Sequence, residues 1–224
     1  MPQHADRQPS AAPRCSAGAR SRRGGRALVA ALGLALALLI AGSALAAIKV
    51  GSPKNDRIVG TPKQDDLRGL EGDDRLIGRG GNDLLIGGPG SDVLRGGRRH
   101  DTADYRDVPG DVLVDLRRGV AIGGGRDKLV SIRSVSGGPG DDVLKGNRQD
   151  NTLIGHGGDD RLVGRGGRDT IVAFEGRDVV RAGPGRDHVL SAGGSRTTVD
   201  CGPGFDSVSA ERGDRLRNCE RVTR

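Results

Sequence analysis

The sequence predicts an all-β solenoid, a fold in which short strands stack in successive turns. From Gly51 the chain repeats every nine residues for six units without a gap, and each unit begins with Gly. The sixth position of every unit is Asp and the eighth is apolar. The composition agrees, because 40 Gly with only one Tyr, two Phe and no Trp cannot build an ordinary globular core. Stacked turns can instead bury a narrow ladder of small aliphatic side chains.

Two arrays of these units supply regularly spaced acidic and apolar side chains. The first array runs from Gly51 and the second from Gly137. Their sixth-position aspartates are Asp56, Asp65, Asp74, Asp83, Asp92 and Asp101, followed by Asp142, Asp160, Asp169, Asp178 and Asp187. Their eighth-position residues are Ile58, Leu67, Leu76, Leu85, Leu94 and Ala103, followed by Leu144, Leu153, Leu162, Ile171, Val180 and Val189. This pattern predicts a solenoid whose turns carry cation ligands.

Within one unit, the first six residues predict a turn and the last three a short strand. Only the middle strand residue points inward, because side chains alternate along a strand. Glycines at the first and fourth positions permit left-handed backbone angles, which would aim carbonyl oxygens at a common point. Carbonyls and a carboxylate are the hard oxygen donors that Ca²⁺ prefers. The glycines of the best-matched units are Gly69, Gly72, Gly78, Gly81, Gly87, Gly90, Gly137, Gly140, Gly155, Gly158, Gly164 and Gly167.

A purely structural interpretation of the aspartates is the alternative. Asp often lies in turns because its side chain hydrogen-bonds the local backbone. Such turns require no strict period and would accept Asn as readily as Asp. The regularity of the two arrays therefore favours ligands over turn formers.

The units resemble the haemolysin-type, RTX calcium-binding nonapeptide G-G-x-G-x-D-x-U-x. GGPGSDVLR at 87–95 and GGPGDDVLK at 137–145 match it at every defined position. The resemblance implies a right-handed parallel β-roll with two repeats per turn and several Ca²⁺ ions between repeats one coil apart. Backbone carbonyls near the glycines named above would complete each shell. The implied ligand pairs are Asp56 with Asp74, Asp65 with Asp83, Asp74 with Asp92, Asp83 with Asp101, Asp142 with Asp160, Asp160 with Asp178, and Asp169 with Asp187.

The segment between the arrays breaks the period and resembles the spacer found in bacterial members of that family. Val112, Val114 and Leu116 alternate as in a half-buried strand, and a turn is expected at Arg118-Gly119. We interpret Asp127 as a residue that caps a turn. The alternative interpretation is that its carboxylate is a ligand in a metal site. Whether the two arrays form one continuous roll stays open at this stage.

Some units depart from the pattern. Asn151 and Arg196 replace Asp at the sixth position, which predicts weakened or lost sites there. The segment Cys201–Asp206 resumes the pattern after a one-residue slip, so a final site using Asp187 and Asp206 is doubtful.

The N-terminus has the features of a secretory signal peptide. A basic region from Arg14 to Arg26 precedes an apolar run from Ala27 to about Ile40, and Ala44-Leu45-Ala46 matches a cleavage pattern. A retained membrane anchor is the alternative, because 27–47 is long enough to span a bilayer. The predicted organisation is a signal peptide (1–46), a first array (47–104), a spacer (105–136), a second array (137–200) and a C-terminal cap (201–224). This predicts a secreted or cell-surface protein.

Cysteines and charge limit the partners. Cys201 and Cys219 form an even pair in a chain expected to be exported, which predicts a disulfide that ties the cap. Residues 1–46 hold six Arg and one Asp, so the remainder has 30 basic and 28 acidic residues. A net charge this small gives little support to nucleic-acid binding. Arginines beside the aspartates serve either solubility or partial neutralisation of the acidic ladder; they are Arg57, Arg75, Arg161, Arg168, Arg177 and Arg186.

The sequence predicts a calcium-binding protein and not an enzyme. The zinc-protease helix H-E-x-x-H, the nucleophile elbow G-x-S-x-G and the P-loop do not occur in it. Binding of several Ca²⁺ ions would be coupled to folding, with no membrane contact after signal cleavage. The alternative is a rigid, surface-displayed solenoid that binds anionic glycans or serves as an adhesin or structural module.

Overall fold

The computed structural model describes residues 47–193 and 196–224, which form strands and turns only. The predicted signal peptide lies outside the described residues. None of the described segments forms a helix long and apolar enough to cross a membrane.

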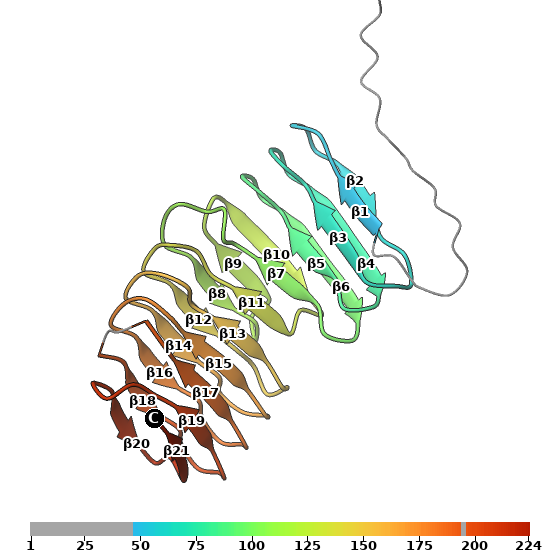
Figure 1. Cartoon of the computed structure of the whole chain (residues 1–224). Helices are drawn as coiled ribbons and strands as arrows, with labels where there is room; N and C mark the ends of the chain where they lie inside the picture. The colour runs from blue at the N-terminus through green and yellow to red at the C-terminus, as the bar shows by residue number, and fades with distance from the viewer. Residues whose placement is uncertain (1–46, 194–195) are drawn as a thin grey trace, which may run out of the picture. The chain divides into compact units, whose positions relative to one another are not determined.

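The strands form two sheets that run along the solenoid (Figure 1). The first sheet contains, in spatial order, β1 (Ala47–Val50), β3 (Asp65–Arg68), β5 (Leu84–Ile86), β7 (Thr102–Asp104), β11 (Ser134–Ser136), β13 (Thr152–Ile154), β15 (Thr170–Ala173), β17 (His188–Ser191), β19 (Ser207–Ser209) and β21 (Arg221–Thr223). The second sheet contains β2 (Arg57–Val59), β4 (Arg75–Gly80), β6 (Val93–Arg98), β10 (Arg126–Val130), β9 (Val120–Ile122), β8 (Leu113–Asp115), β12 (Val143–Lys145), β14 (Arg161–Val163), β16 (Val179–Arg181), β18 (Thr198–Asp200) and β20 (Arg215–Arg217).

One coil of the solenoid consists of two nonapeptide units. Consecutive strands of an array alternate between the sheets, and each pairs in parallel with the strand one coil away. Leu67 of β3 thus lies beside Leu85 of β5, and Leu76 of β4 lies beside Leu94 of β6. The predicted parallel β-solenoid is confirmed.

The core is a double ladder of aliphatic side chains, one from each strand. Leu85, Leu94, Leu153 and Leu162 are completely buried, whereas the residues on either side of each point outward or sit half-buried. The eighth position is therefore the one strictly apolar position because it alone faces the opposite sheet.

The spacer continues both sheets instead of separating two rolls. In the first sheet β11 pairs in parallel with β7 on one side and with β13 on the other. In the second sheet β10, β9 and β8 form two successive antiparallel pairs between β6 and β12. The turn predicted at Arg118-Gly119 joins β8 to β9, and Val112 and Val114 are buried as expected. The antiparallel β9 is a local exception to the predicted parallel arrangement.

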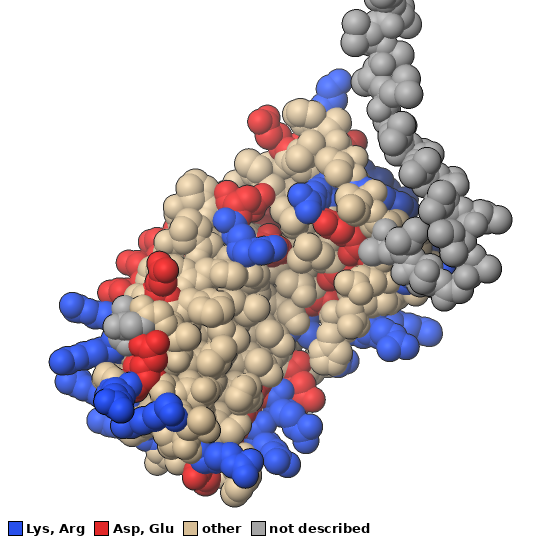
Figure 2. All heavy atoms as spheres, viewed as in Figure 1, with Lys and Arg blue, Asp and Glu red and all other residues tan. Residues whose placement is uncertain are grey.

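The outward face of the first sheet is uncharged over three neighbouring strands. β13, β15 and β17 present Thr152 and Ile154, Thr170 and Val172, and His188 and Leu190. Figure 2 shows an uncharged strip here with charged side chains gathered on both sides of it.

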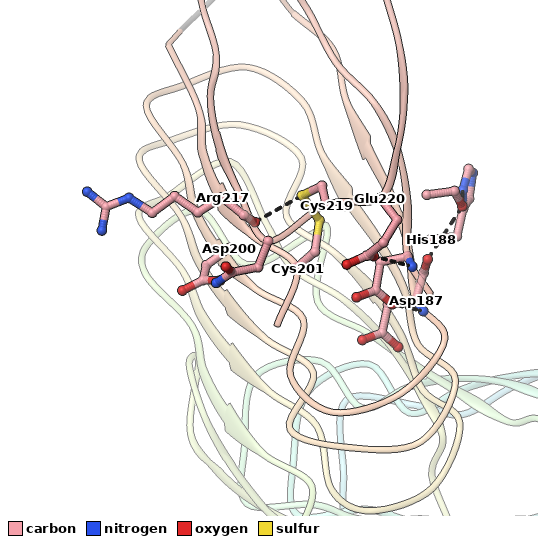
Figure 3. The surroundings of a disulfide bond; sticks show 10 residues. Asp187, His188, Asp200, Cys201, Arg217, Cys219 and Glu220 are labelled. Carbon is pink, nitrogen blue, oxygen red and sulfur yellow. Dashed lines mark hydrogen bonds between the residues drawn. A yellow bond between two sulfur atoms is a disulfide. The ribbon is translucent and has the colours of Figure 1, made fainter. Parts of the chain in front are cut away.

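The C-terminal cap extends the solenoid by stacking on the last coil of the array. β19 pairs with β17 and β21 pairs with β19, while β20 pairs with β18. Cys201 takes the first position of its coil, where most other units have Gly, and is fully buried. It forms the predicted disulfide with Cys219, 18 residues on and one coil away (Figure 3).

Reduction of this disulfide is expected to destabilise the cap. The closed loop spans 18 residues, for which loop entropy gives about 3 kcal/mol. Chemical denaturation of the oxidised and reduced protein, each in excess calcium, measures the difference. A Cys201→Ser, Cys219→Ser variant controls for the reductant, which should not change its stability. Equal midpoints for the oxidised and reduced protein would contradict the prediction.

Candidate metal centres in the turns

The aspartates of the sixth position form hydrogen-bonded ladders along the solenoid. In most of them the carboxylate Oδ1 accepts the backbone N–H of the sixth-position residue one coil earlier. The N–H of Asp56 donates to Asp74 Oδ1 at 2.8 Å, and the N–H of Asp142 donates to Asp160 Oδ1 at 2.8 Å. One oxygen of each carboxylate therefore ties neighbouring coils together, a role that the nine-residue period alone did not reveal.

Two such ladders run along the molecule, one at each row of turns. In the first ladder the aspartates lie in the turns that lead into the second sheet; it contains Asp56, Asp74, Asp92 and Asp127, then Asp142, Asp160 and Asp178. The ladder before the first sheet contains Asp65, Asp83 and Asp101, then Asn151, Asp169, Asp187 and Asp206. The structure thus aligns each predicted pair of aspartates one coil apart.

The second carboxylate oxygen separates the aspartates into two groups. In eight of them Oδ2 is buried without a hydrogen-bond partner among the described residues: Asp74, Asp83, Asp92, Asp101, Asp160, Asp169, Asp187 and Asp206. In the others Oδ2 already accepts a hydrogen bond. The donors are Ser52 to Asp56, Thr61 to Asp65, Gly138 to Asp142, and the Thr197 hydroxyl to Asp178. A buried acceptor without a donor is costly, so the eight open oxygens suit a bound cation.

The first-position glycines leave the space in which those oxygens meet. A Cβ at Gly78 would overlap both Asp83 Oδ2 and the carbonyl oxygen of Gly96, and a Cβ at Gly69 would overlap the equivalent pair. The predicted left-handed backbone is wrong for these glycines, which are required by close approach. It holds for fourth-position glycines such as Gly72, with φ +108°.

The donors in these turns are all oxygens. Among residues 47–193 and 196–224, no three Asp, Glu, His or Cys side chains converge on a common metal position. A cation in a turn would be held by one or two carboxylates together with backbone carbonyls. Ca²⁺ accepts such oxygen sets, whereas Zn²⁺ selects His and Cys.

A family model for the RTX calcium-binding nonapeptide repeat matches the chain in four copies, at residues 50–85, 86–104, 136–171 and 169–197. These spans cover just over half of the chain. The chain belongs to the RTX calcium-binding repeat family. No curated protein sequence matches it.

Burial changes the acidity of the RTX aspartates. Removal from water raises the pKa of Asp160 to about 8, and the nearby charges of Asp142 and Asp178 add to the effect. Burial likewise raises the pKa of Asp83, Asp92 and Asp169 to about 7 and that of Asp187 to about 6. Without a cation, the carboxyls of Asp83, Asp92, Asp160 and Asp169 are therefore partly protonated near neutral pH, and a cation would take the place of the proton.

In chelator, the RTX solenoid is expected to be more stable in mild acid than at slightly alkaline pH. These carboxyls have higher pKa values when folded than the ordinary 3.8, so the folded state binds more protons. Their contribution is complete below about pH 4 and is lost as pH rises through about 6 to 8. The far-UV circular dichroism signal of the β structure in chelator at pH 5 and at pH 8 measures this. Saturating calcium is the control, since protons then compete with the ion and the trend should weaken or reverse. A larger β signal at pH 8 than at pH 5 in chelator would contradict it.

The RTX ladder includes residues that the period did not identify. Asp127 lies in strand β10 and is not a turn cap: its Oδ1 accepts the N–H of Asp92, 35 residues earlier, and its Oδ2 accepts the buried Tyr105 hydroxyl. The ladder also crosses the one-residue slip, because the N–H of Asp187 donates to Asp206 at 2.7 Å and that of Asp206 to Glu220 at 2.8 Å. Neither Glu220 nor Asp127 belongs to a recognisable nine-residue unit, so the repeat pattern could not identify them.

The structure corrects which residue replaces Asp in the ladder one coil after Asp178. Register places Thr198 beside Val179, so Thr197 and not Arg196 occupies the ladder position after Asp178. The extra residue in this coil shifts the alignment by one. Arg196 instead occupies the fifth position.

A second, exposed ladder uses the fifth positions of the units. Asp73 Oδ1 accepts the N–H of Ser91, and Asp159 Oδ1 accepts the N–H of Arg177. These side chains reach the coil that follows, whereas the buried ladder reaches the coil before. Together the two ladders clamp each turn on both sides.

The arginines beside the aspartates do not neutralise the buried ladder directly. Ion pairs among the described residues involve Arg68, Arg106, Arg118 and Arg165 only, and none includes a sixth-position aspartate of the arrays. One of these pairs links the second array to the spacer: the Arg165 guanidinium contacts Asp115 at 2.8 Å and lowers the pKa of that carboxyl to about 2.

Proposed function

We propose that this RTX protein is an exported calcium-binding protein whose folding is coupled to the binding of several Ca²⁺ ions in its turns. The observation that carries the proposal is the set of eight buried, unpartnered Asp Oδ2 atoms, six of which lie beside the first-position glycine of their own turn. The activity proposed is binding, not catalysis.

The two carboxylate oxygens of each aspartate and the nearby carbonyls would have different roles in binding. The Oδ1 of an aspartate with an open Oδ2 holds the neighbouring coil by its backbone hydrogen bond, as between Asp160 and Asp142. Each open Oδ2 supplies negative charge, and carbonyls such as that of Gly96 beside Asp83 supply further oxygens. When bound, Ca²⁺ would offset the repulsion and desolvation of the buried carboxylates. Aspartates whose Oδ2 is already hydrogen-bonded, such as Asp56 and Asp142, would contribute less.

Calcium is the cation that this donor set favours over magnesium. Ca²⁺ accepts six to eight oxygens in flexible geometry, whereas Mg²⁺ requires a compact octahedron and retains several waters. A turn whose donors are largely backbone carbonyls therefore suits Ca²⁺ better than Mg²⁺. Extracellular calcium modules of this type have affinities of about 10⁻⁴ to 10⁻³ M.

Two features support export. Residues 14–46 have the charge, apolar run and small-x-small pattern of a signal peptide. The Cys201–Cys219 disulfide suits an oxidising compartment. We therefore propose that the protein acts outside the cytoplasm, where millimolar calcium is available.

Equilibrium calcium binding tests the proposal, with magnesium as the competing ion. The protein should bind up to eight Ca²⁺ ions, one for each open Oδ2, and Mg²⁺ at the same concentration should not displace them. Absence of calcium binding at 10 mM, about ten times the weakest expected dissociation constant, would refute the function.

An Asp160→Asn variant locates the site. Asn retains the Oδ1 acceptor for the N–H of Asp142 but removes the carboxylate charge at the open position, so this variant should bind one Ca²⁺ ion fewer than the unsubstituted protein. Asp159→Asn is the matched control, because Asp159 is the exposed neighbour and its Oδ1 can still accept from Arg177. Equal calcium loss in both variants would assign binding to surface charge in general.

A further inference from the structure

A hollow of about 680 Å³ lies near the C-terminal end of the second sheet. Its lining consists of Arg177, Asp178, Val179, Arg196, Thr198 and Arg215. Three of its six residues are thus arginines from three successive coils. This is the opposite charge to that of the metal turns.

The basic hollow lies where the ladder of buried aspartates is interrupted. Thr197 occupies the position that Asp has in neighbouring coils, and Arg196 precedes it where Asp141 and Asp159 stand in earlier coils. Arg177 occupies the same fifth position one coil before. Arg215 of β20 lies directly beside Thr198 of β18 in the sheet.

The three guanidinium groups have no carboxylate partner in the described part of the chain, since the ion pairs there involve other arginines. The nearby carboxylates are already engaged. Asp178 accepts hydrogen bonds from the N–H of Asp160 and the hydroxyl of Thr197. Asp214 accepts them from the N–H groups of Thr197 and Glu211. The hollow therefore presents a surplus of positive charge and unused donors.

The positive charge continues across the outward face of the second sheet. Arg161, Arg181 and Arg217 lie on β14, β16 and β20 and are exposed. Asp200 is the acidic residue on β18, and it accepts a hydrogen bond from Asn218. Figure 2 shows Lys and Arg side chains gathered toward this end of the molecule. Adjacent strands are about 4.8 Å apart, so this face spaces its charges regularly.

We propose that this hollow binds a sulfate or phosphate oxyanion carried by an acidic polysaccharide that extends over the basic face. Arg presents a planar fork that matches oxyanion geometry, and Thr198 adds a neutral hydroxyl donor to the lining of the same hollow. A polymer with repeated negative groups fits the repeated arginines better than a single small anion. Nucleic acid fits less well, because base stacking needs aromatic side chains and the hollow has none. The proposal is independent of calcium binding.

Binding of a heparin-derived hexasaccharide to the whole protein in excess calcium and 0.1 M NaCl tests this inference. An Arg177→Gln, Arg196→Gln, Arg215→Gln variant should bind at least about thirtyfold more weakly, because it loses three charge-assisted contacts. The matched control is Arg57→Gln, Arg75→Gln, Arg95→Gln, which removes the same charge from the other end of the same sheet. Its affinity should change by less than about threefold, because exposed distant charges are screened.

Further measurements separate the hollow from general charge effects. Thr198→Val removes only the central hydroxyl and should weaken binding about threefold. Circular dichroism in calcium checks that each variant is folded. Equal weakening of both triple variants would overturn the assignment of the hollow. A single-stranded DNA oligonucleotide of the same charge that bound more tightly than the hexasaccharide would overturn the choice of a polysaccharide.

Discussion

Chelation of calcium should remove most of the β signal from the far-UV circular dichroism spectrum, and calcium should restore it. In calcium at ten times the dissociation constant, each site adds about 1.4 kcal/mol to the free energy of unfolding. Eight open carboxylate oxygens would then contribute about 11 kcal/mol, which equals the whole stability of an ordinary domain. The apo solenoid has only one or two small aliphatic side chains per half-coil to offset the buried charge.

The controls for this experiment follow from the donor set and the pKa shifts. Magnesium should not restore the spectrum at concentrations where calcium does. Acidification to pH 5 in chelator should restore part of it, because protons also neutralise buried carboxyls such as Asp160. A spectrum that is already β-rich in chelator at pH 8 would show that the ladder is structural without the ion.

A Gly78→Ala substitution should cost about 4 kcal/mol in excess calcium. The new Cβ would meet Asp83 Oδ2 and the Gly96 carbonyl at distances that real Cβ atoms do not adopt. Relief requires movement of backbone within paired strands, for which overpacking costs about 3 kcal/mol. Displacement of the carboxylate also removes one site and about 1.4 kcal/mol more.

Gly110→Ala is the matched control, because a Cβ there meets nothing within 4 Å. It should change stability by less than about 0.5 kcal/mol. Denaturation in calcium, and in chelator at pH 5 where protons restore part of the fold, separates the two terms of the Gly78 prediction: the strain persists in chelator and the ion term does not. Similar small effects of both substitutions would show that Gly78 is not needed by the turn.

The sequence was sufficient for the repeated part of the fold. A strict apolar eighth position implies one inward side chain per strand, and the structure buries Leu85 and Leu153 as expected. The Cys pair at 201 and 219 is bridged. These features were predictable because they depend on side-chain alternation and on neighbours one or two units away.

The spacer and the C-terminal slip were less predictable. Asp127 joins the ladder through contacts with residues 35 and 22 positions away, and no period marks it. One extra residue before β18 moved the ladder position from Arg196 to Thr197, because sheet register follows the buried Val199 and not the count of residues. That shift also produced the basic hollow.

The sequence alone therefore determined the solenoid, its eighteen-residue coil, its RTX relationship and the residues that line its turns. Tertiary structure decided which carboxylate oxygens are open to a cation. Both oxygens of Asp142 accept hydrogen bonds, whereas Asp160 retains an open one. The two residues have the same place in the repeat. Their difference lies in the donors that the surrounding turn and the neighbouring coil present to them, and those are set only when the chain is wound.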